Sequence, residues 1–224
     1  MKNIVIVGSG AVAAELTMYI EDGNKYLLEQ DRMMIIGYLD SEENVSKYWA
    51  KYKFEKPVLS DVYSYRISQM ESFIVAISNI DFRRKMSDFL KSKGANLISF
   101  IHPNSIISKT AIIGNQNIIY PYCIVGPNTV IGNNNLLTSY SFISHDCSIG
   151  NDNFFSTAGL SGNVRVGSCN YFGIRSTVLP NVTIGDRNTI QAGMIVDKNV
   201  FNESLIFHRF KEKVISISNM KNDE

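Results

Sequence analysis

The chain is poor in several residue types, and each shortage excludes a kind of site or a class of partner. Its 224 residues include 3 cysteines and 3 histidines, and neither set has the spacing of a disulfide framework or a metal site. The 22 Lys and Arg nearly balance the 21 Asp and Glu, for a formal net charge of +1. This balance gives no electrostatic reason to expect nucleic acid or an acidic membrane surface as a partner. No apolar run reaches the roughly 20 residues of a membrane span.

An apolar residue returns every sixth position from Ile101 to Ile149, and this period is the dominant feature of the sequence. One residue drops out near Leu160, after which the column continues from Val166 to Val196. A period of six fits neither an α-helix nor an alternating strand, so it indicates a repeat architecture. Hexads of this kind predict a left-handed parallel β-helix of triangular section, called the coil below.

Two columns of residues are expected inside the coil, because residues i and i+2 of a strand share a face. The residue two before each aliphatic one is mostly small, which fills a narrow interior without overpacking. This column holds Ala111, Cys123, Thr129, Ser141, Cys147, Ser176 and Asn188. Glycine or asparagine recurs at the corners and tolerates positive φ there. The corner asparagines are Asn115, Asn128, Asn133, Asn134, Asn151, Asn163 and Asn181.

The coil takes up about half of the chain, so a second domain is expected before it. We predict a Rossmann-like α/β domain with a small parallel sheet over residues 1–98, the all-β coil over residues 99–200, and a tail over residues 201–224. The expected strands of the first domain are Ile4–Val7, Met33–Leu39 and Phe73–Ile77.

A glycine-rich turn follows the first strand and leads into a helix expected over Ala13–Ile20. This arrangement points backbone N–H groups and a helix N-terminus at phosphate. Strand ends at one edge of an open α/β sheet form the ligand crevice. We therefore expect a nucleotide-sugar site made of Gly8, Ser9, Gly10, Asp40, Ser78 and Asn79. The alternatives are that the glycine-rich turn is purely structural and that Asp40 caps a helix or a turn.

Residues from Lys2 to Val200 resemble the sugar O- and N-acyltransferases with hexapeptide repeats. The resemblance is carried by VIVGSG, GYLD, FIVAISN and SHDCSIG, and by the stretch from Gly162-Asn163-Val164 to Val178-Leu179-Pro180-Asn181. The family includes sialic acid O-acetyltransferases and acetyltransferases of nucleotide-linked 4-amino sugars. The resemblance implies a homotrimer with a UDP-like amino sugar, not NAD, on the first domain. It also implies acetyl-CoA as co-substrate, bound along the coil between subunits.

His145 is the candidate general base, because an imidazole can take a proton from an attacking group near pH 7. It lies in a corner of the coil, where its ring can project outward. The resemblance gives Asp146 the role of orienting that ring, and this pairing needs the geometry of the corner. The alternative for His145 is a solvated corner residue. Gly162, Gly173 and Ile174 match the family's contacts to the acyl donor, although glycine at a corner also serves shape alone.

Three positions depart from the family. Val12 and Phe154 stand where the family has histidines, which leaves the acceptor open. The family's Gly-Val-Pro-Ala-Lys-like turn, which ends the coil, is replaced by the residues from Ile206 to Lys211. Arg209 and Lys211 either meet CoA phosphates or are solvated tail charges.

Metal chemistry is not expected, because His102, His145 and His208 lie too far apart in a coil of about 18 residues per turn. The cysteines fit a reducing compartment, so we expect a cytoplasmic protein.

The best interpretation is an acetyl-CoA-dependent sugar N-acetyltransferase. The alternatives are O-acetylation of a sugar hydroxyl, a non-catalytic repeat protein without a donor site, and a nicotinamide oxidoreductase.

A third column, directed outward, is apolar in the first half of the coil and mostly polar beyond the deletion. It holds Ile106, Ile112, Ile118, Ile124, Val130, Leu136 and Phe142 before the deletion, and Arg165, Tyr171, Thr177, Thr183 and Thr189 after it. Contiguous apolar surface is usually a contact site. We expect the first half of the coil to carry most of the subunit and interdomain packing.

Overall fold

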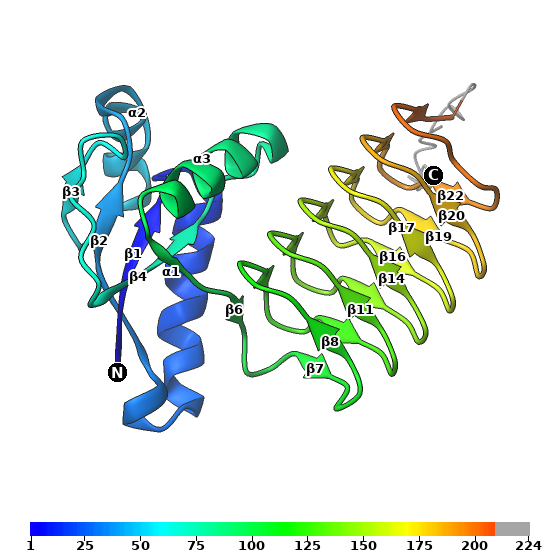
Figure 1. Ribbon diagram of the computed structural model, residues 1–224, viewed down its shortest axis with the longest axis horizontal. Helices are drawn as coiled ribbons and strands as arrows, with labels where there is room; N and C mark the ends of the chain where they lie inside the picture. Colours follow the sequence, from blue (N-terminus) through cyan, green and yellow to red (C-terminus); the bar gives the residue numbers. More distant parts are fainter. Residues whose placement is uncertain (209–224) are drawn as a thin grey trace, which may run out of the picture.

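The computed structural model describes residues 1–208, which form a small α/β domain followed by a long coil (Figure 1). The first domain has a five-stranded parallel sheet in the order β3-β2-β1-β4-β5. Its strands are β1 (Lys2–Val7), β2 (Met33–Leu39), β3 (Val58–Ser60), β4 (Glu71–Val75) and β5 (Asn96–Leu97). Its helices are α1 (Ala11–Gly23), α2 (Glu42–Tyr52) and α3 (Ile80–Ser92), with short 3₁₀ turns at η1 (Asn24–Tyr26) and η2 (Glu29–Asp31). The predicted Rossmann-like parallel sheet is confirmed, although β4 ends two residues earlier than expected.

The coil is a left-handed parallel β-helix with three faces, each a parallel sheet of two-residue strands. The face toward the first domain, called the docked face, holds β6 (Phe100–Ile101), β9 (Ile118–Ile119), β12 (Leu136–Leu137), β15 (Phe154–Phe155), β18 (Tyr171–Phe172), β21 (Thr189–Ile190) and β23 (Leu205–Ile206). The second face holds β7 (Ile106–Ile107), β10 (Ile124–Val125), β13 (Phe142–Ile143), β16 (Gly159–Leu160), β19 (Thr177–Val178) and β22 (Ile195–Val196). The third face holds β8 (Ile112–Ile113), β11 (Val130–Ile131), β14 (Ser148–Ile149), β17 (Arg165–Val166) and β20 (Thr183–Ile184).

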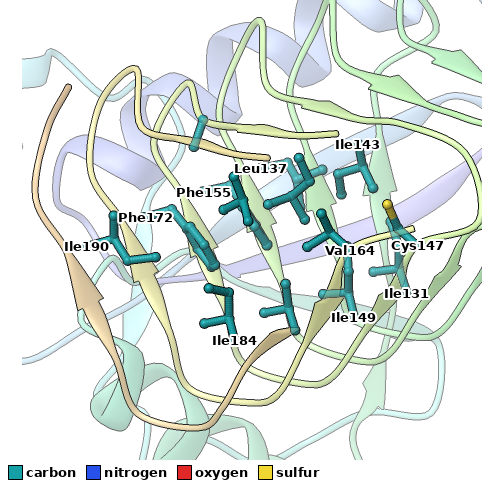
Figure 2. Close-up of a cluster of buried hydrophobic side chains, with 14 of the residues drawn as sticks. Ile131, Leu137, Ile143, Cys147, Ile149, Phe155, Val164, Phe172, Ile184 and Ile190 are labelled. Carbon is teal, nitrogen blue, oxygen red and sulfur yellow. The ribbon is translucent and has the colours of Figure 1, made fainter. Parts of the chain in front are cut away.

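The period-six column fills the interior of the coil from Ile119 to Val196, as the sequence predicts, whereas Ile101 at its start is 38% exposed. Figure 2 shows these side chains stacked from one turn of the coil to the next. Phe155 and Phe172 stack with ring centroids 4.5 Å apart and planes 10° from parallel. The small column is also inside, and Cys123, Thr129, Ser141, Cys147, Ser176 and Asn188 are at most 2% exposed. The coil continues past residue 200, because β23 pairs with β21 in register.

The glycines of the hexads are required for a different reason from the positive φ that was expected at the corners. Asn128, Asn134, Asn163 and Asn181 do have positive φ, between 56° and 65°. The hexad glycines do not. A Cβ on Gly132 would lie 2.7 Å from the carbonyl oxygen of Gly150 in the next turn of the coil. These glycines are therefore required by the close stacking of adjacent turns.

The two domains share a core along the docked face. Phe100, Ile118, Tyr120 and Leu136 are buried in one cluster with residues of β1 and α1. Arg83 of α3 is 1% exposed and donates to the backbone oxygens of Ile77 in the first domain and Asn153 in the coil. Ile118 and Leu136 of the apolar outward column thus pack against the first domain, whereas Ile106 and Ile112 of that column are exposed.

Candidate functional site

The glycine-rich turn joins β1 to α1 and is fixed by backbone sterics. Gly8 has φ +114°, and a Cβ there would lie 2.9 Å from the carbonyl oxygen of Ala76. Its N–H donates to the backbone oxygen of Leu39 at 2.8 Å. Gly10 differs, because a Cβ on it would meet nothing within 4 Å. Gly8 is thus needed by the fold, whereas Gly10 leaves open space.

That open space belongs to a pocket of about 460 Å³, called the turn pocket. The structure brings all six residues of the expected nucleotide cluster to its lining: Gly8, Ser9, Gly10, Asp40, Ser78 and Asn79. Val12, where the family has a histidine, lines it too. Tyr48 and Tyr52 of α2 complete one wall, with ring centroids 6.2 Å apart and planes 21° from parallel. Sequence reasoning missed these two tyrosines, although their i, i+4 spacing places them on one face of α2.

Asp40 is held by internal hydrogen bonds. Its Oδ2 accepts from the backbone N–H and the hydroxyl of Ser9, both at 2.7 Å. Its Oδ1 accepts from the N–H of Ser41 and the amide of Asn44, both at 2.8 Å. An ionised carboxylate has about four acceptor sites, so these bonds occupy them all. Asp40 therefore fastens the turn to the end of β2.

The N-terminus of α1 is the helix end available to a ligand. Ser41 caps α2 by accepting from the N–H of Asn44, and Asn79 caps α3 by accepting from the N–H of Phe82 at 2.9 Å. Gly10 caps α1 without a side-chain hydrogen bond, and no acidic residue lies in the first turn. The first-turn N–H groups of α1 therefore lack a capping side chain and open onto the turn pocket, an arrangement suited to phosphate.

His145 lies on the corner between the second and third faces, called the far edge because the docked face is opposite. Its ring is 60% exposed, and its Nδ1 lies 2.7 Å from Oδ2 of Asp146. The left-handed backbone of Asp146, with φ +57°, turns the carboxylate back toward the ring. Asn128, one turn of the coil earlier, donates to Oδ1 of Asp146 at 3.3 Å. Hydrogen bonds from His145 and Asn128 lower the pKa of the Asp146 carboxyl below its usual value.

This geometry suits His145 to the role of a general base. An ionised Asp146 favours the proton on Nδ1 of a neutral His145 ring, which leaves the lone pair of Nε2 free. Sequence reasoning missed Asn128. The coil length of 18 residues would have found it, because Asn128 and Asp146 are 18 positions apart.

Gly162 lies directly against the imidazole. A Cβ on Gly162 would be 2.6 Å from both Cε1 and Nε2 of His145. Gly173 and Ile174 are elsewhere, on the corner between the docked and second faces, and Ile174 is 53% exposed. The structure therefore brings together His145, Asp146 and Gly162, but not the other two residues assigned to the acyl donor.

The remaining expected positions are quickly placed. Phe154 lies on the docked face, and the buried His102 accepts at Nδ1 from the N–H of Asn104 at 3.1 Å. Arg209 and Lys211 lie outside the described residues. In the part of the chain that the structure describes, no three His, Cys, Asp or Glu side chains could jointly hold a metal ion. No helix within residues 1–208 has the length and apolarity to cross a bilayer.

Comparison with known proteins supports the repeat and the fold. Residues 110–145 match the family described as bacterial transferase hexapeptide (six repeats). PerB from Caulobacter crescentus, solved with CoA and GDP-perosamine, is 22% identical, with a TM-score of 0.79 over 92% of this chain and 93% of that one. The acetyltransferase domain of PglB from Neisseria gonorrhoeae is 20% identical, with a TM-score of 0.76 over 89% and 93%. WeeI from Acinetobacter baumannii is 21% identical, with a TM-score of 0.75 over 92% and 96%. Residues 110–145 thus match the bacterial transferase hexapeptide repeat, and across nearly its whole length the chain has the fold of these three proteins.

Proposed function

We propose that the chain is an acetyl-CoA-dependent N-acetyltransferase that acts on the amino group of a nucleotide-linked amino sugar. The His145–Asp146 pair is the observation that carries the proposal, because it presents a free imidazole nitrogen on an exposed edge. The structures of similar fold add support. PerB is solved with CoA and GDP-perosamine, and the PglB domain with acetyl coenzyme A.

The reaction needs one proton acceptor and a positioned thioester. The amine nitrogen attacks the thioester carbonyl, and Nε2 of His145 takes the proton that the nitrogen releases. The C–N bond forms, the C–S bond of the tetrahedral intermediate breaks, and the proton passes to the departing CoA sulfur. Asp146 stabilises the imidazolium in between. The reaction is a direct transfer and needs no metal.

The nucleotide belongs in the turn pocket. Its diphosphate accepts from the free N–H groups of Gly10 and the first turn of α1, and its base lies near Tyr48 and Tyr52. Asp40 positions the turn without touching the ligand. Ser78 and Asn79 contribute backbone groups to this site. The side-chain oxygen of Asn79 is already used, because it caps α3.

A second copy of the chain completes the site. The far edge is opposite the docked face, so the turn pocket of a protomer and its own His145 lie on different sides of the coil. Large aliphatic side chains also remain exposed on the other two faces, among them Ile106 at 67% and Ile112 at 64%. We assign these faces to contacts within a homotrimer, where His145 of one copy meets the turn pocket of another. Acetyl-CoA in that groove would touch Gly162 of one copy, and Gly173 and Ile174 of a neighbour.

Cysteine chemistry suggests a cytoplasmic location. The described chain holds three free thiols, and burial raises the pKa of Cys123 to about 12. Such inert thiols fit a reducing compartment.

A thiol-release assay tests the proposal. Acetyl-CoA is offered with UDP-, GDP- and dTDP-linked amino sugars, and with sugars that present only hydroxyls. We expect turnover with one amino sugar, and its loss in His145→Ala but not in His208→Ala, which removes another exposed histidine. Turnover with hydroxyl acceptors alone would instead indicate an O-acetyltransferase. Full activity of His145→Ala would show that His145 is not the general base.

A further inference from the structure

A second cavity, called the interdomain pocket, adjoins the turn pocket. It has a volume of about 640 Å³ and lies between the start of α3 and the docked face. Ser78 and Asn79 line both cavities, so the two adjoin at the loop between β4 and α3. Both volumes fall in the range of roughly 300–1,000 Å³ typical of small-molecule sites. One ligand can therefore extend from one pocket into the other.

The coil side of the interdomain pocket is aromatic. Phe154 and Tyr171, from adjacent turns on the docked face, both line it. Their ring centroids are 5.4 Å apart and their planes are 86° apart, so one ring meets the other edge-on. Both side chains are partly exposed. A partly exposed edge-to-face pair inside a cavity offers a firm apolar surface to a ligand.

Beside this pocket, two arginines share the carboxylate of Asp81. Oδ1 of Asp81 lies 3.5 Å from a guanidinium nitrogen of Arg84 and 3.6 Å from one of Arg187. The pocket also presents the rings of Phe154 and Tyr171 and the hydroxyl of Thr189, groups that suit a hydroxyl-bearing ring. The turn pocket, in contrast, offers uncapped backbone N–H groups suited to an anion.

We infer that the interdomain pocket is the subsite for the pyranose ring of the nucleotide-linked sugar, with Phe154 and Tyr171 as the platform for its apolar C–H face. This assignment rests on the proposed function. It divides one substrate between two cavities, with the nucleoside diphosphate in the turn pocket and the sugar beyond Ser78 and Asn79. It also gives Phe154 a role. Where the family has a histidine that can form hydrogen bonds, the phenyl ring of Phe154 contacts the ring of the sugar.

Calorimetry with paired ligands tests this division. A nucleoside diphosphate and the matching nucleotide sugar are titrated, without acetyl-CoA, into the wild-type protein, Tyr171→Ala and Phe154→Leu. Leucine keeps the apolar packing of Phe154 against the first domain, and thermal unfolding of each variant checks the fold. We expect about a tenfold loss of affinity for the nucleotide sugar, and less than a twofold change for the nucleoside diphosphate.

Gly10→Asp is the matched variant of the other pocket and should weaken both ligands together. Equal losses for both ligands in Tyr171→Ala, or none for the nucleotide sugar, would overturn the assignment. Because no acetyl transfer is measured, this result is independent of the thiol-release assay. Absent turnover with intact selective binding would reject the proposed reaction and keep the sugar subsite.

Discussion

The turn pocket and the far edge differ in how complete they are within one chain. The turn pocket is concave, and its parts come from three strand ends and three helices of one domain. At the far edge, in contrast, the side chain of His145 is 60% exposed. In the proposed function, a single protomer therefore binds the nucleotide, and another copy places the base beside the bound sugar. Binding and catalysis should be separable by substitution.

The largest expected effect is that of His145→Ala on the rate. General-base catalysis contributes a factor of about 10² to 10⁴, so kcat should fall by about 10³. Nucleotide affinity should stay within twofold, because the ring lies on the far edge. Steady-state kinetics and calorimetry on the same preparation measure both quantities. A matching loss of nucleotide affinity would break the separation between the two sites.

Gly10→Asp should have the opposite profile. An aspartate at this N-cap position accepts from the first-turn N–H groups of α1 and competes with phosphate. Nucleotide affinity should fall by at least about tenfold, while the melting temperature stays equal or rises. Calorimetry and thermal unfolding check this.

Gly8→Ala is the control for that variant. Its φ of +114° and the nearby Ala76 oxygen make a side chain costly, by about 1–3 kcal/mol. A stable Gly8→Ala with normal binding would show that the turn is more adaptable than its backbone geometry indicates.

Gly162→Ala sharpens the description of the far edge. The added methyl group would displace the His145 ring, which can rotate away, so kcat should fall by about tenfold with little loss of stability. Gly150→Ala is the contrast, because its methyl group would meet the backbone oxygen of Gly167 at 2.6 Å. That variant should lose about 2 kcal/mol of stability. Similar unfolding curves for the two variants would argue against this account of Gly162.

The smallest effect concerns Asp146 and pH. Its pKa is lowered in the folded state, so its stabilising contribution is present at neutral pH and is lost as pH falls through that lowered pKa. The difference in melting temperature between wild type and Asp146→Asn should therefore move in favour of wild type as the pH rises from about 3 to 6. A difference that does not change with pH would contradict the described hydrogen bonds.

Sequence patterns predicted those features that depend on local periodicity. The period of six placed Ile143 and Phe155 inside the coil, because strand geometry alone decides which face a residue occupies. Contacts between turns of the coil were harder to predict. Gly159, for example, leaves room for the ring of Phe142, which lies across it. Nothing in the sequence around Gly159 indicates that contact.

The site residues also divide into those that the sequence predicts and those that depend on contacts between distant segments. Asp146 was expected beside His145 from the family resemblance, because adjacency on a regular strand would point the two side chains apart. Two of the four hydrogen bonds of Asp40 come from Ser9, 31 positions away, and could not be read from spacing. The interdomain pocket was not predicted, since it exists only where α3 meets the docked face. Figure 1 shows α3 on the side of the first domain that faces the coil.

The most direct test is whether two impaired variants restore each other, at a nucleotide-sugar concentration too low for the Gly10→Asp pocket to bind. His145→Ala and Gly10→Asp are co-expressed with different tags, and assemblies that carry both tags are purified and assayed for thiol release. If the turn pocket of one copy works with His145 of another, mixed assemblies regain a substantial part of wild-type activity. Mixed assemblies as inactive as either variant alone would contradict the shared site.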